Sequence, residues 1–450
     1  MDEFHSNQQS PAEDWVQEMN ESYAVASMGG KVLVAILEYS HDLKMNSWQY
    51  FSFQTFRDLH CNQWVMEGKK KSAKGKAWLT HQDRSENRRV ILDATMPCGI
   101  EKPGFLNLWS GFNVKLNLAP LGSYEELINF IRHAIASDNE VSFQYIIQWL
   151  AYCAQNPDKM PEVALVLRGK QGTGKGLLAR LMVSLFGENG LQISTRKHLT
   201  GDFNAHLQSV CFLCADEAYF AGDKSDTGNL KAKITEPTML IEPKGVNAFR
   251  VANHMSVMMT TNEDFAVPAS KDERRYAVFD TNPDIAKDTA YFAPLYKIVE
   301  VEANKAAFLD YLLNLDLTGF NIRNFPITDA LRQQYTESLT SMAVWWMSVL
   351  SSGRLLFDKW PDNVTVRQIA LNWESWAKDN AVSTFDRRRG NDTAIGIFLS
   401  GKRGEPKFIG SKIKEGSGYS YKMLDLNVAR VAFIKRFDMP ADVFGGEYDE

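Results

Sequence analysis

Residues 163–187 read VALVLRGKQGTGKGLLARLMVSLFG. An apolar run, Val163–Leu167, leads into a glycine-rich segment, and a helical pattern of apolar residues starts at Leu177. The spacing Gly-x4-Gly-Lys, from Gly169 to Lys175, is that of a phosphate-binding P-loop when it lies between a strand and a helix. Glycines let successive backbone N–H groups turn towards an anion, and the helix N-terminus adds its dipole. The stretch therefore predicts an α/β domain that binds phosphate.

The loop residues are the candidate ATP contacts. Lys175 would place its charge beside the β- and γ-phosphates, and the backbone around it would surround them. The candidates are Gly169, Gln171, Gly172, Thr173, Gly174, Lys175, Gly176 and Leu177. Gly176 departs from the pattern, because a Ser or Thr hydroxyl normally binds Mg²⁺ at this position. Water or another side chain would have to take its place. A chance glycine-rich turn is the alternative interpretation.

Residues 210–217, VCFLCADE, form an apolar run that ends in two carboxylates. Downstream of a P-loop, Asp216 would bind Mg²⁺, directly or through water, and Glu217 would act as a general base on the attacking water. Cys211 and Cys214 have a spacing that would suit a metal, but no second Cys or His pair stands at ligand spacing. We therefore expect buried thiols.

Two further elements would complete a catalytic site. Residues 254–262 are an apolar run that ends in Asn262, which would orient the lytic water; an ordinary turn asparagine is the alternative. Arg274 and Arg275 directly precede another apolar run, which starts at Tyr276. Arg275 is the first candidate for an arginine finger that reaches the nucleotide of a neighbouring subunit, and Arg274 is the second. Ion pairs at a strand edge are the alternative.

These four elements, in this order, resemble the superfamily 3 helicase domain of phage, plasmid and virus primase-helicases. The similarity extends over roughly residues 100–340. It includes weaker sequence matches at residues 105–112, 203–204, 230–245 and 330–339.

The resemblance implies an AAA+-like P-loop ATPase core that uses ATP and Mg²⁺. It also implies a homo-oligomer, usually a hexameric ring, that moves on single-stranded DNA and unwinds forked DNA in the replication of a phage or mobile element. In this family a hairpin before the strand that ends in the water-orienting residue carries a basic residue into the central channel of the ring. Lys244 stands at the matching position. An exposed turn lysine is the alternative. The first hundred residues offer no convincing set of metal-binding carboxylates, so a separate primase or polymerase is an expected partner.

Two other functions remain open. An ATP-dependent loader or remodeller would use the same ATPase residues without unwinding duplex DNA. A monomeric P-loop kinase would need no Asn262, no arginine in trans and no basic hairpin.

The composition is that of an ordinary globular protein. The chain has 450 residues, a net charge of -5 and 44% hydrophobic residues. An acidic balance leans against a surface coated in DNA contacts, but a ring motor needs positive charge only along its channel. No apolar run is long enough to span a membrane, and the acidic N-terminus is unlike a signal peptide. Five scattered cysteines are typical of a reducing cytoplasm, here that of a bacterial host.

The expected organisation has six parts. A flexible acidic tail (1–20) precedes an α+β domain (21–115) that opens with a hairpin at Gly29-Gly30. Two helices follow (116–160), then the ATPase core (161–285) and a helical segment (286–350) in which 330–350 reads as one helix. The C-terminal region (351–450) is mostly helical, with a hairpin or loop at 400–418 that would suit a winged helix. Lysines at 68–76 and basic residues at 386–390 and 402–414 are solvated loops or phosphate contacts.

Overall fold

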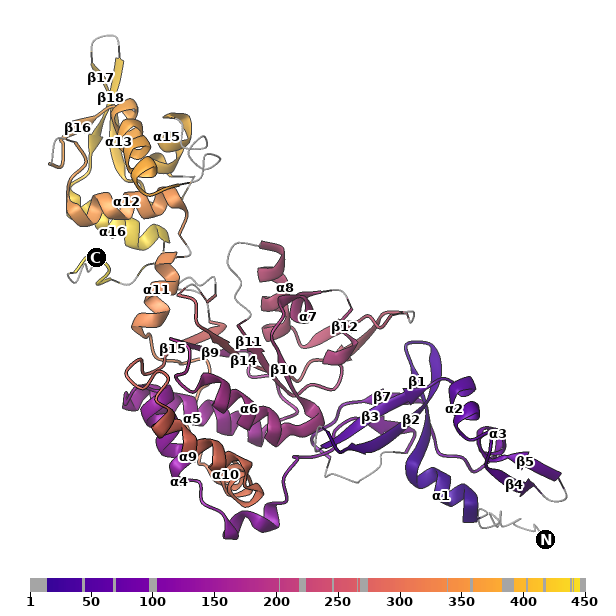
Figure 1. Cartoon of the computed structure of the whole chain (residues 1–450). Coiled ribbons are helices and arrows are strands. Elements are labelled where there is room, and N and C mark those ends of the chain that lie inside the picture. The colour runs from indigo at the N-terminus through magenta and orange to yellow at the C-terminus, as the bar shows by residue number, and fades with distance from the viewer. Residues whose placement is uncertain are drawn as a thin grey trace, which may run out of the picture. The chain divides into compact units, whose positions relative to one another are not determined.

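The computed structural model shows a mixed α/β protein in two compact units (Figure 1). It describes residues 14–445 except 43–44, 68–69, 97–102, 202, 218–223, 245–246, 265, 268–273, 338, 357–358, 383–391, 402–403, 416–417, 438 and 440. The first unit holds residues 1–219, 223–262 and 279–326, and the second holds 220–222, 263–278 and 327–450. Within the described residues, no helix is long and apolar enough to cross a membrane.

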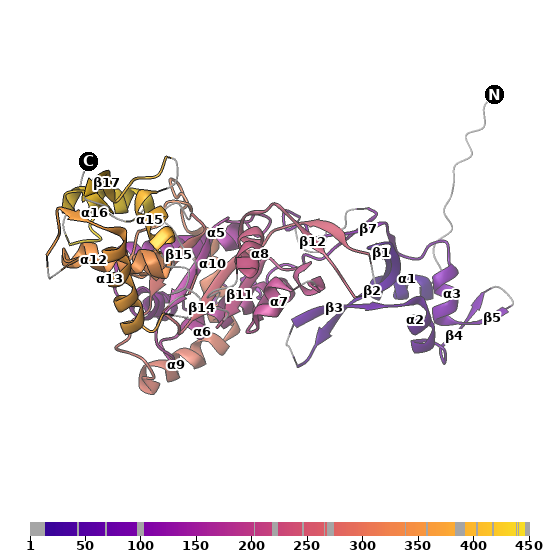
Figure 2. The same ribbon diagram turned by 90° about the horizontal axis from the view of Figure 1, so that it is seen from above.

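The N-terminal part of the first unit is built on a four-stranded sheet in the order β3-β2-β1-β6, of which Figure 2 labels β1, β2 and β3. Its strands are β1 (Tyr23–Met28), β2 (Lys31–Ser40), β3 (Met45–Phe51) and β6 (Glu86–Asn87). The predicted hairpin is confirmed, because Met28 pairs with Lys31 across Gly29 and Gly30, which both have positive φ. Positive φ at both turn positions matches the twist of the two strands.

Three helices and a two-stranded ribbon flank this sheet. They are α1 (Asp14–Ser22), α2 (Phe53–Leu59), α3 (Lys74–Thr80) and the ribbon of β4 (Trp64–Glu67) and β5 (Lys70–Ala73). Helix α1 buries Val16 and Met19 in a core with Phe56 and Trp78. The expected flexible tail was therefore wrong over residues 14–20, where two apolar side chains at i and i+3 fix a helix against the sheet. Residues 1–13 lie outside the described residues.

Two short strands and then a series of helices connect the N-terminal part to the central sheet. The short strands β7 (Arg89–Ile91) and β8 (Phe105–Asn107) pair in parallel. After a 3-10 helix at Leu116–Leu121 come α4 (Glu125–Phe130), a π-helical turn (Ile131–Ile135) and α5 (Glu140–Gln155). The predicted helix pair with a break before Glu140 is confirmed, and the Asn139 side chain caps α5 by accepting from the Ser142 N–H.

The central sheet has five strands in the order β10-β11-β14-β9-β15. They are β9 (Ala164–Arg168), β10 (Gly190–Ile193), β11 (Phe212–Asp216), β14 (Ser256–Thr261) and β15 (Tyr276–Asp280). The pairs β10·β11, β11·β14 and β14·β9 are parallel. Every residue of β9 and β14 is buried, as expected for parallel strands covered on both faces.

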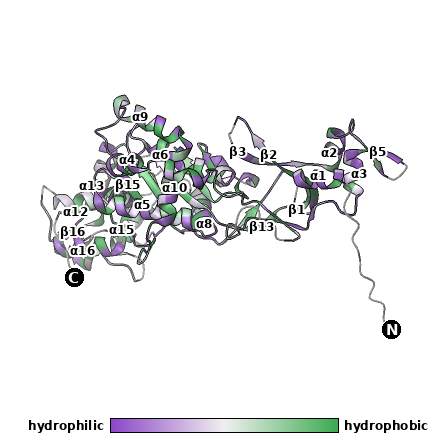
Figure 3. Ribbon diagram, turned by 90° about the horizontal axis from the view of Figure 1, so that it is seen from below, coloured by the Kyte–Doolittle hydropathy of each residue, from purple (hydrophilic) through white to green (hydrophobic). Residues whose placement is uncertain are grey.

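Helices and a hairpin surround this sheet. The helices are α6 (Lys175–Phe186), α7 (Arg196–Thr200), α8 (Lys224–Thr235), α9 (Thr289–Glu300) and α10 (Glu302–Asn314). The hairpin consists of β12 (Thr238–Ile241) and β13 (Phe249–Ala252), which pair antiparallel. In Figure 3 helices α6, α8, α9 and α10 carry both the hydrophobic and the hydrophilic colour, as helices with one buried face do.

The second unit contains α11 (Asp329–Glu337), α12 (Ser341–Ser352), α13 (Val366–Asp379), α15 (Asp392–Ser400) and α16 (Leu426–Phe437). Strands β16 (Asn363–Val364), β17 (Ile409–Glu415) and β18 (Gly418–Met423) form a sheet in the order β16-β18-β17. Of the two alternatives for the 400–418 segment, a hairpin is present, but β17 and β18 extend from 409 to 423, later in the chain than expected. The basic residues at 386–390, 402 and 403 lie outside the described residues.

The prediction of one helix over 330–350 was wrong. Two helices occupy this stretch, and Thr340 between them accepts a hydrogen bond from the Ala343 N–H as the N-cap of α12. A helix N-cap has extended rather than helical dihedrals, so the chain cannot run through it as a single helix. The unit boundary at residue 327 also differs from the expected boundary at 350, because α12 packs with α13 and α16.

Candidate nucleotide-binding site

Three adjacent strands of the central sheet end at the predicted catalytic residues. Strand β9 leads into the glycine-rich loop, β11 ends at Asp216, and β14 ends just before Asn262. These strands are neighbours and parallel, so their carboxyl ends lie at one edge of the sheet. Ligands of open α/β sheets bind at this edge.

The glycines of the loop have the backbone that the phosphate-binding hypothesis requires. Gly169, Gly172 and Gly174 have φ values of 152°, 86° and 92°. Each also packs closely on its surroundings: an added Cβ would lie 2.2 Å from the Thr281 hydroxyl at Gly169 and 2.6 Å from Phe130 at Gly174. Conformation and space therefore both restrict these positions to glycine.

Lys175, the first residue of α6, folds back into the loop. Its Nζ donates to the carbonyl oxygens of Gly169 and Lys170 at 2.7 and 2.9 Å, and only 6% of the residue is exposed. Burial lowers the pKa of this lysine to about 8, although the charges of Asp216 and Glu217 act in the opposite direction. A bound anion would favour its charged form.

The other loop residues are placed as follows. Gln171 and Gly172 are exposed, whereas Thr173 is fully buried, and its hydroxyl lies 2.8 Å from that of Thr281. Gly176 and Leu177 lie in the first turn of α6, with Leu177 buried. An exposed loop that leads into a buried helix start is suited to a ligand that approaches from solvent.

Asp216 is held by two neighbours that no local sequence pattern indicates. The Thr260 hydroxyl donates to its Oδ1, and the Gln192 amide donates to its Oδ2 at 3.0 Å. Thr260 pairs with Asp216 in the register of β14 and β11, and Gln192 lies on β10. The half-buried carboxylate is thereby fixed at the edge of the sheet.

Glu217 and Asn262 contact each other. The Asn262 amide donates to Glu217 Oε1 at 2.9 Å, and both residues are exposed. Glu217 has a φ of 55°, which is uncommon for a residue with a side chain, and its N–H donates to the Thr260 carbonyl. Strained residues of this kind are enriched at functional sites.

The Asp216 carboxylate fits a magnesium site in which the protein supplies only one or two ligands. Mg²⁺ commonly takes one or two carboxylates and completes its shell with phosphate oxygens and water. Asp216 retains free lone pairs on both oxygens after accepting its two hydrogen bonds. No group of three or more His, Cys, Asp or Glu side chains suited to a metal occurs in the part of the chain that the structure describes.

Arg168 is a further residue at this edge that sequence reasoning missed. At the end of β9 it pairs with Asp280 through two bonds, Nε to Oδ1 at 2.7 Å and an Nη to Oδ2 at 2.9 Å. The arginine is buried and the aspartate is half exposed. This paired geometry fixes the start of the loop against the end of β15. A conspicuous Arg at the end of an apolar strand was the available signal.

Lys244 is exposed in the turn between β12 and β13, while Gly245 and Val246 lie outside the described residues, and its contact with DNA stays a prediction. The buried Asn204 holds this hairpin: its amide donates to the Leu240 carbonyl, and its side-chain oxygen accepts from the Glu242 N–H, both at 2.8 Å. Asn204 lies in the segment between α6 and β11, so these two bonds link that segment to the hairpin.

Arg274 and Arg275, which belong to the second unit, directly precede β15. Arg274 is exposed and Arg275 is partly buried. The strand from Tyr276 is present as predicted. Whether either arginine reaches a neighbouring subunit stays a prediction.

The paired cysteines are core residues. Cys211 and Cys214 are each 1% exposed or less, and burial raises the pKa of both thiols. They are therefore protonated hydrophobic side chains in and next to β11. The expectation of buried thiols is confirmed.

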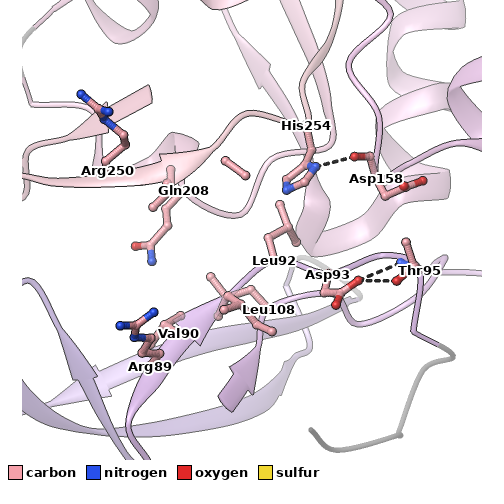
Figure 4. A pocket seen from close by; sticks show the side chains of 13 residues that line it. Arg89, Val90, Leu92, Asp93, Thr95, Leu108, Asp158, Gln208, Arg250 and His254 are labelled. Carbon is pink, nitrogen blue, oxygen red and sulfur yellow. Dashed lines mark hydrogen bonds between the residues drawn. The ribbon is translucent and has the colours of Figure 1, made fainter. Parts of the chain in front are cut away.

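A separate pocket of about 460 Å³ lies beside β7 and β13 (Figure 4). Arg89 and Gln208 line it, and His254 Nδ1 lies 2.6 Å from the Asp158 carbonyl oxygen, to which it donates. Figure 4 shows the Arg250 side chain pointing away from Arg89. None of the predicted ATP contacts or catalytic residues lines this pocket.

The comparisons with known proteins find a family model and a phage DNA primase-polymerase. A model of a family of unknown function, DUF5906, matches residues 167–275, a range that holds every predicted site residue. The chain is 23% identical over 244 residues to the DNA primase-polymerase of Nitratiruptor phage NrS-1. That match covers 51% of this chain and 34% of the phage protein, so it spans about a third of that protein's length.

The fold is shared with solved structures of the same phage protein's C-terminal region. An apo structure of the NrS-1 C-terminal region matches with a TM-score of 0.59 and 16% identity, covering 91% of this chain and 97% of that one. An A-form apo structure of the region matches with a TM-score of 0.61 and 15% identity, covering 91% and 98%. At this identity the similarity establishes the fold alone.

Proposed function

We propose that this chain is an ATP-driven DNA motor of the superfamily 3 helicase type that acts in phage DNA replication. The observation that carries the proposal is the convergence of Lys175, Asp216, Glu217 and Asn262 at one edge of the sheet. The similarity to a phage primase-polymerase supports the replication role. Such a motor would work in the cytoplasm of a bacterial host.

The core would be an AAA+-like P-loop ATPase, because β14 lies between the strand of the loop and the strand of the acids. This strand order brings Asn262 between Lys175 and Glu217. Loop N–H groups and Lys175 would bind the phosphates of ATP, and Thr281 and Lys287 would support the loop. Asp216 would hold Mg²⁺, which would neutralise phosphate charge, and water would take the place of the hydroxyl missing at Gly176.

Glu217 would accept the proton of the attacking water. The Asn262 amide donates a hydrogen bond to the Glu217 carboxylate. It would therefore orient either this base or the attacking water. An arginine from a neighbouring subunit, Arg275 first and Arg274 second, would offset charge in the transition state. The active site would then require a homo-oligomer, which we propose to be a hexameric ring.

The β12–β13 hairpin would couple hydrolysis to DNA. Lys244 is exposed at its turn, and Asn204 ties its base to the core. Movement of this hairpin would pull the phosphates of single-stranded DNA. A winged helix in the second unit, built from α12, β16, α13, α15, β17 and β18, would supply a further contact with forked DNA. A separate primase or polymerase is the proposed protein partner.

The test compares ATPase rate and strand displacement in wild type, Glu217→Gln and Lys244→Ala. We expect Glu217→Gln to bind ATP but to lose about 10²–10⁴-fold in turnover, because a general base is missing. Lys244→Ala should keep basal turnover and lose unwinding. Turnover without unwinding in wild type would favour a loader or remodeller, and a DNA-indifferent monomeric ATPase would favour a kinase.

A further inference from the structure

The ribbon of β4 and β5, residues 64–67 and 70–73, has one face open to solvent. Trp64 pairs with Ala73 and Met66 pairs with Lys71, so these four side chains share a face. Trp64 and Met66 are each 56% exposed, and Lys71 is exposed. Of the eleven tryptophans, all of which lie in described residues, Trp64 alone is among the exposed large hydrophobic side chains.

The opposite face of the ribbon is anchored. Ser72 is buried and Val65 is partly buried, and both strands contact α3. Helix α3 is itself fixed, because Trp78 is fully buried and an added Cβ at Gly75 would lie 2.9 Å from His60. The exposed face is therefore presented by a rigid support, with little ordering left to occur when a ligand binds.

One lysine lies over the ring of the exposed tryptophan, and other lysines are close to it in sequence. The Lys71 ammonium lies 4.9 Å from the centre of the Trp64 ring, and Lys70 and Lys76 are exposed nearby in sequence. Lys74, by contrast, is paired with Glu18 at 2.8 Å. Glu67 lies opposite Lys70, on the other face of the ribbon. No carboxylate shares the face of Trp64, Met66 and Lys71 among the described ribbon residues.

We propose that this ribbon binds single-stranded DNA, with a base stacked on Trp64 and with Lys71 on a neighbouring phosphate. Aromatic platforms flanked by basic side chains are how proteins hold single strands without reading sequence. An unpaired base offers its face to the indole, whereas bases in a duplex are already stacked. Lys71 would move from the ring to a phosphate when the base arrives. The site lies outside the ATPase residues and does not depend on ATP hydrolysis.

The experiment uses the full chain without nucleotide and a 20-nucleotide oligo-dT. Trp64 is the tryptophan most open to acrylamide, so DNA should protect the fluorescence of wild type from this quencher. Trp64→Ala should lose that protected component and bind the oligonucleotide roughly 5- to 100-fold more weakly. Lys71→Ala should reduce the salt slope of binding by about 0.7, which is the contribution of one single-strand phosphate contact.

Two control variants match the test variants. Tyr39→Ala removes another exposed aromatic side chain of the same part, and Lys31→Ala removes another exposed lysine. Both should bind DNA as wild type does, and unchanged thermal unfolding of Trp64→Ala would establish that it is folded. Unchanged DNA affinity in Trp64→Ala, without protection of wild type from acrylamide, would overturn the proposal and leave the ribbon to a protein partner. A preference for duplex oligo-dA·dT would also overturn it.

Discussion

At the scale of single residues, Lys175 makes a prediction about protons. Its pKa is about 8 in the folded chain and near its ordinary value of 10.5 in the unfolded chain. Between these values the unfolded state binds more protons, so the unfolding free energy should rise with pH in this window. A phosphate next to the amine favours the charged form, so ATP affinity should fall as the pH rises through 8.

Calorimetry measures the corresponding proton uptake. At pH 8.5, binding of a non-hydrolysable ATP analogue should give different enthalpies in Tris and in phosphate buffer, because a fraction of a proton is taken up. At pH 7 the lysine is almost fully charged before binding, and the two enthalpies should agree. Equal enthalpies at pH 8.5 would mean that Lys175 does not meet the phosphates.

Two glycines of the same loop should respond in opposite ways. At Gly176 an added Cβ would meet only the Arg180 guanidinium, at 3.8 Å. Gly176→Ser should therefore fold, gain about 0.5 kcal/mol from helix propensity and lower the Mg²⁺ concentration for half-maximal ATPase activity. At Gly174 the φ of 92° and the nearby Phe130 and Phe292 should make Gly174→Ala cost at least about 1–2 kcal/mol. Urea unfolding measures the stability of both variants, and a magnesium titration of ATPase activity tests Gly176→Ser. An unchanged magnesium requirement in Gly176→Ser would mean that the added hydroxyl does not join the ligands of Mg²⁺.

The predicted and the missed residues of the site differ in where their information lies. Lys175, Asp216 and Glu217 stand inside local patterns of strand, loop and helix, so the sequence alone selects them. Gln192 and Thr260 contact Asp216 only because β10, β11 and β14 pair in a particular register. Register depends on tertiary packing, and no local pattern contains it.

At the scale of elements, Asn204 should connect the hairpin to the core. Asn204→Ala would leave the Leu240 carbonyl and the Glu242 N–H without their side-chain partner, at a cost of about 1–3 kcal/mol. Its neighbour Phe203 is 65% exposed, so Phe203→Ala should change the unfolding free energy by less than about 0.5 kcal/mol. DNA stimulation of the ATPase should fall in Asn204→Ala alone. If DNA stimulated the ATPase activity of both variants equally, the hairpin would not couple DNA binding to ATP hydrolysis.

Element boundaries were harder to predict than element types. The hairpin at Gly29-Gly30 carries its own turn signal, and the strands of the core carry their own apolar runs. The break at Thr340 follows from one side-chain cap within a continuous apolar pattern, and the helix at Asp14 follows from packing on a sheet far from it in sequence. Both depend on contacts that compete with local periodicity.

At the scale of the whole molecule, the proposed site is divided between two subunits. Lys175→Ala loses the phosphate contact but keeps Arg275, and Arg275→Ala keeps the phosphate contact. Each variant alone should be inactive. In a ring with head-to-tail contacts, mixing equal amounts should create interfaces in which an intact loop meets an intact arginine.

Random mixing makes about one interface in four intact, so the mixture should recover up to about a quarter of wild-type ATPase activity per subunit. Recovery should require the variants to be combined before ring assembly or under conditions where subunits exchange, and dilution below the assembly concentration should abolish it. A mixture of Lys175→Ala with Glu217→Gln is the control, since both changes affect the same half of the site and no interface regains both groups. Recovery of activity in this control would mean that Lys175 and Glu217 act from different subunits. If Arg275→Ala alone were active, the site would be complete within one subunit and would not need a ring.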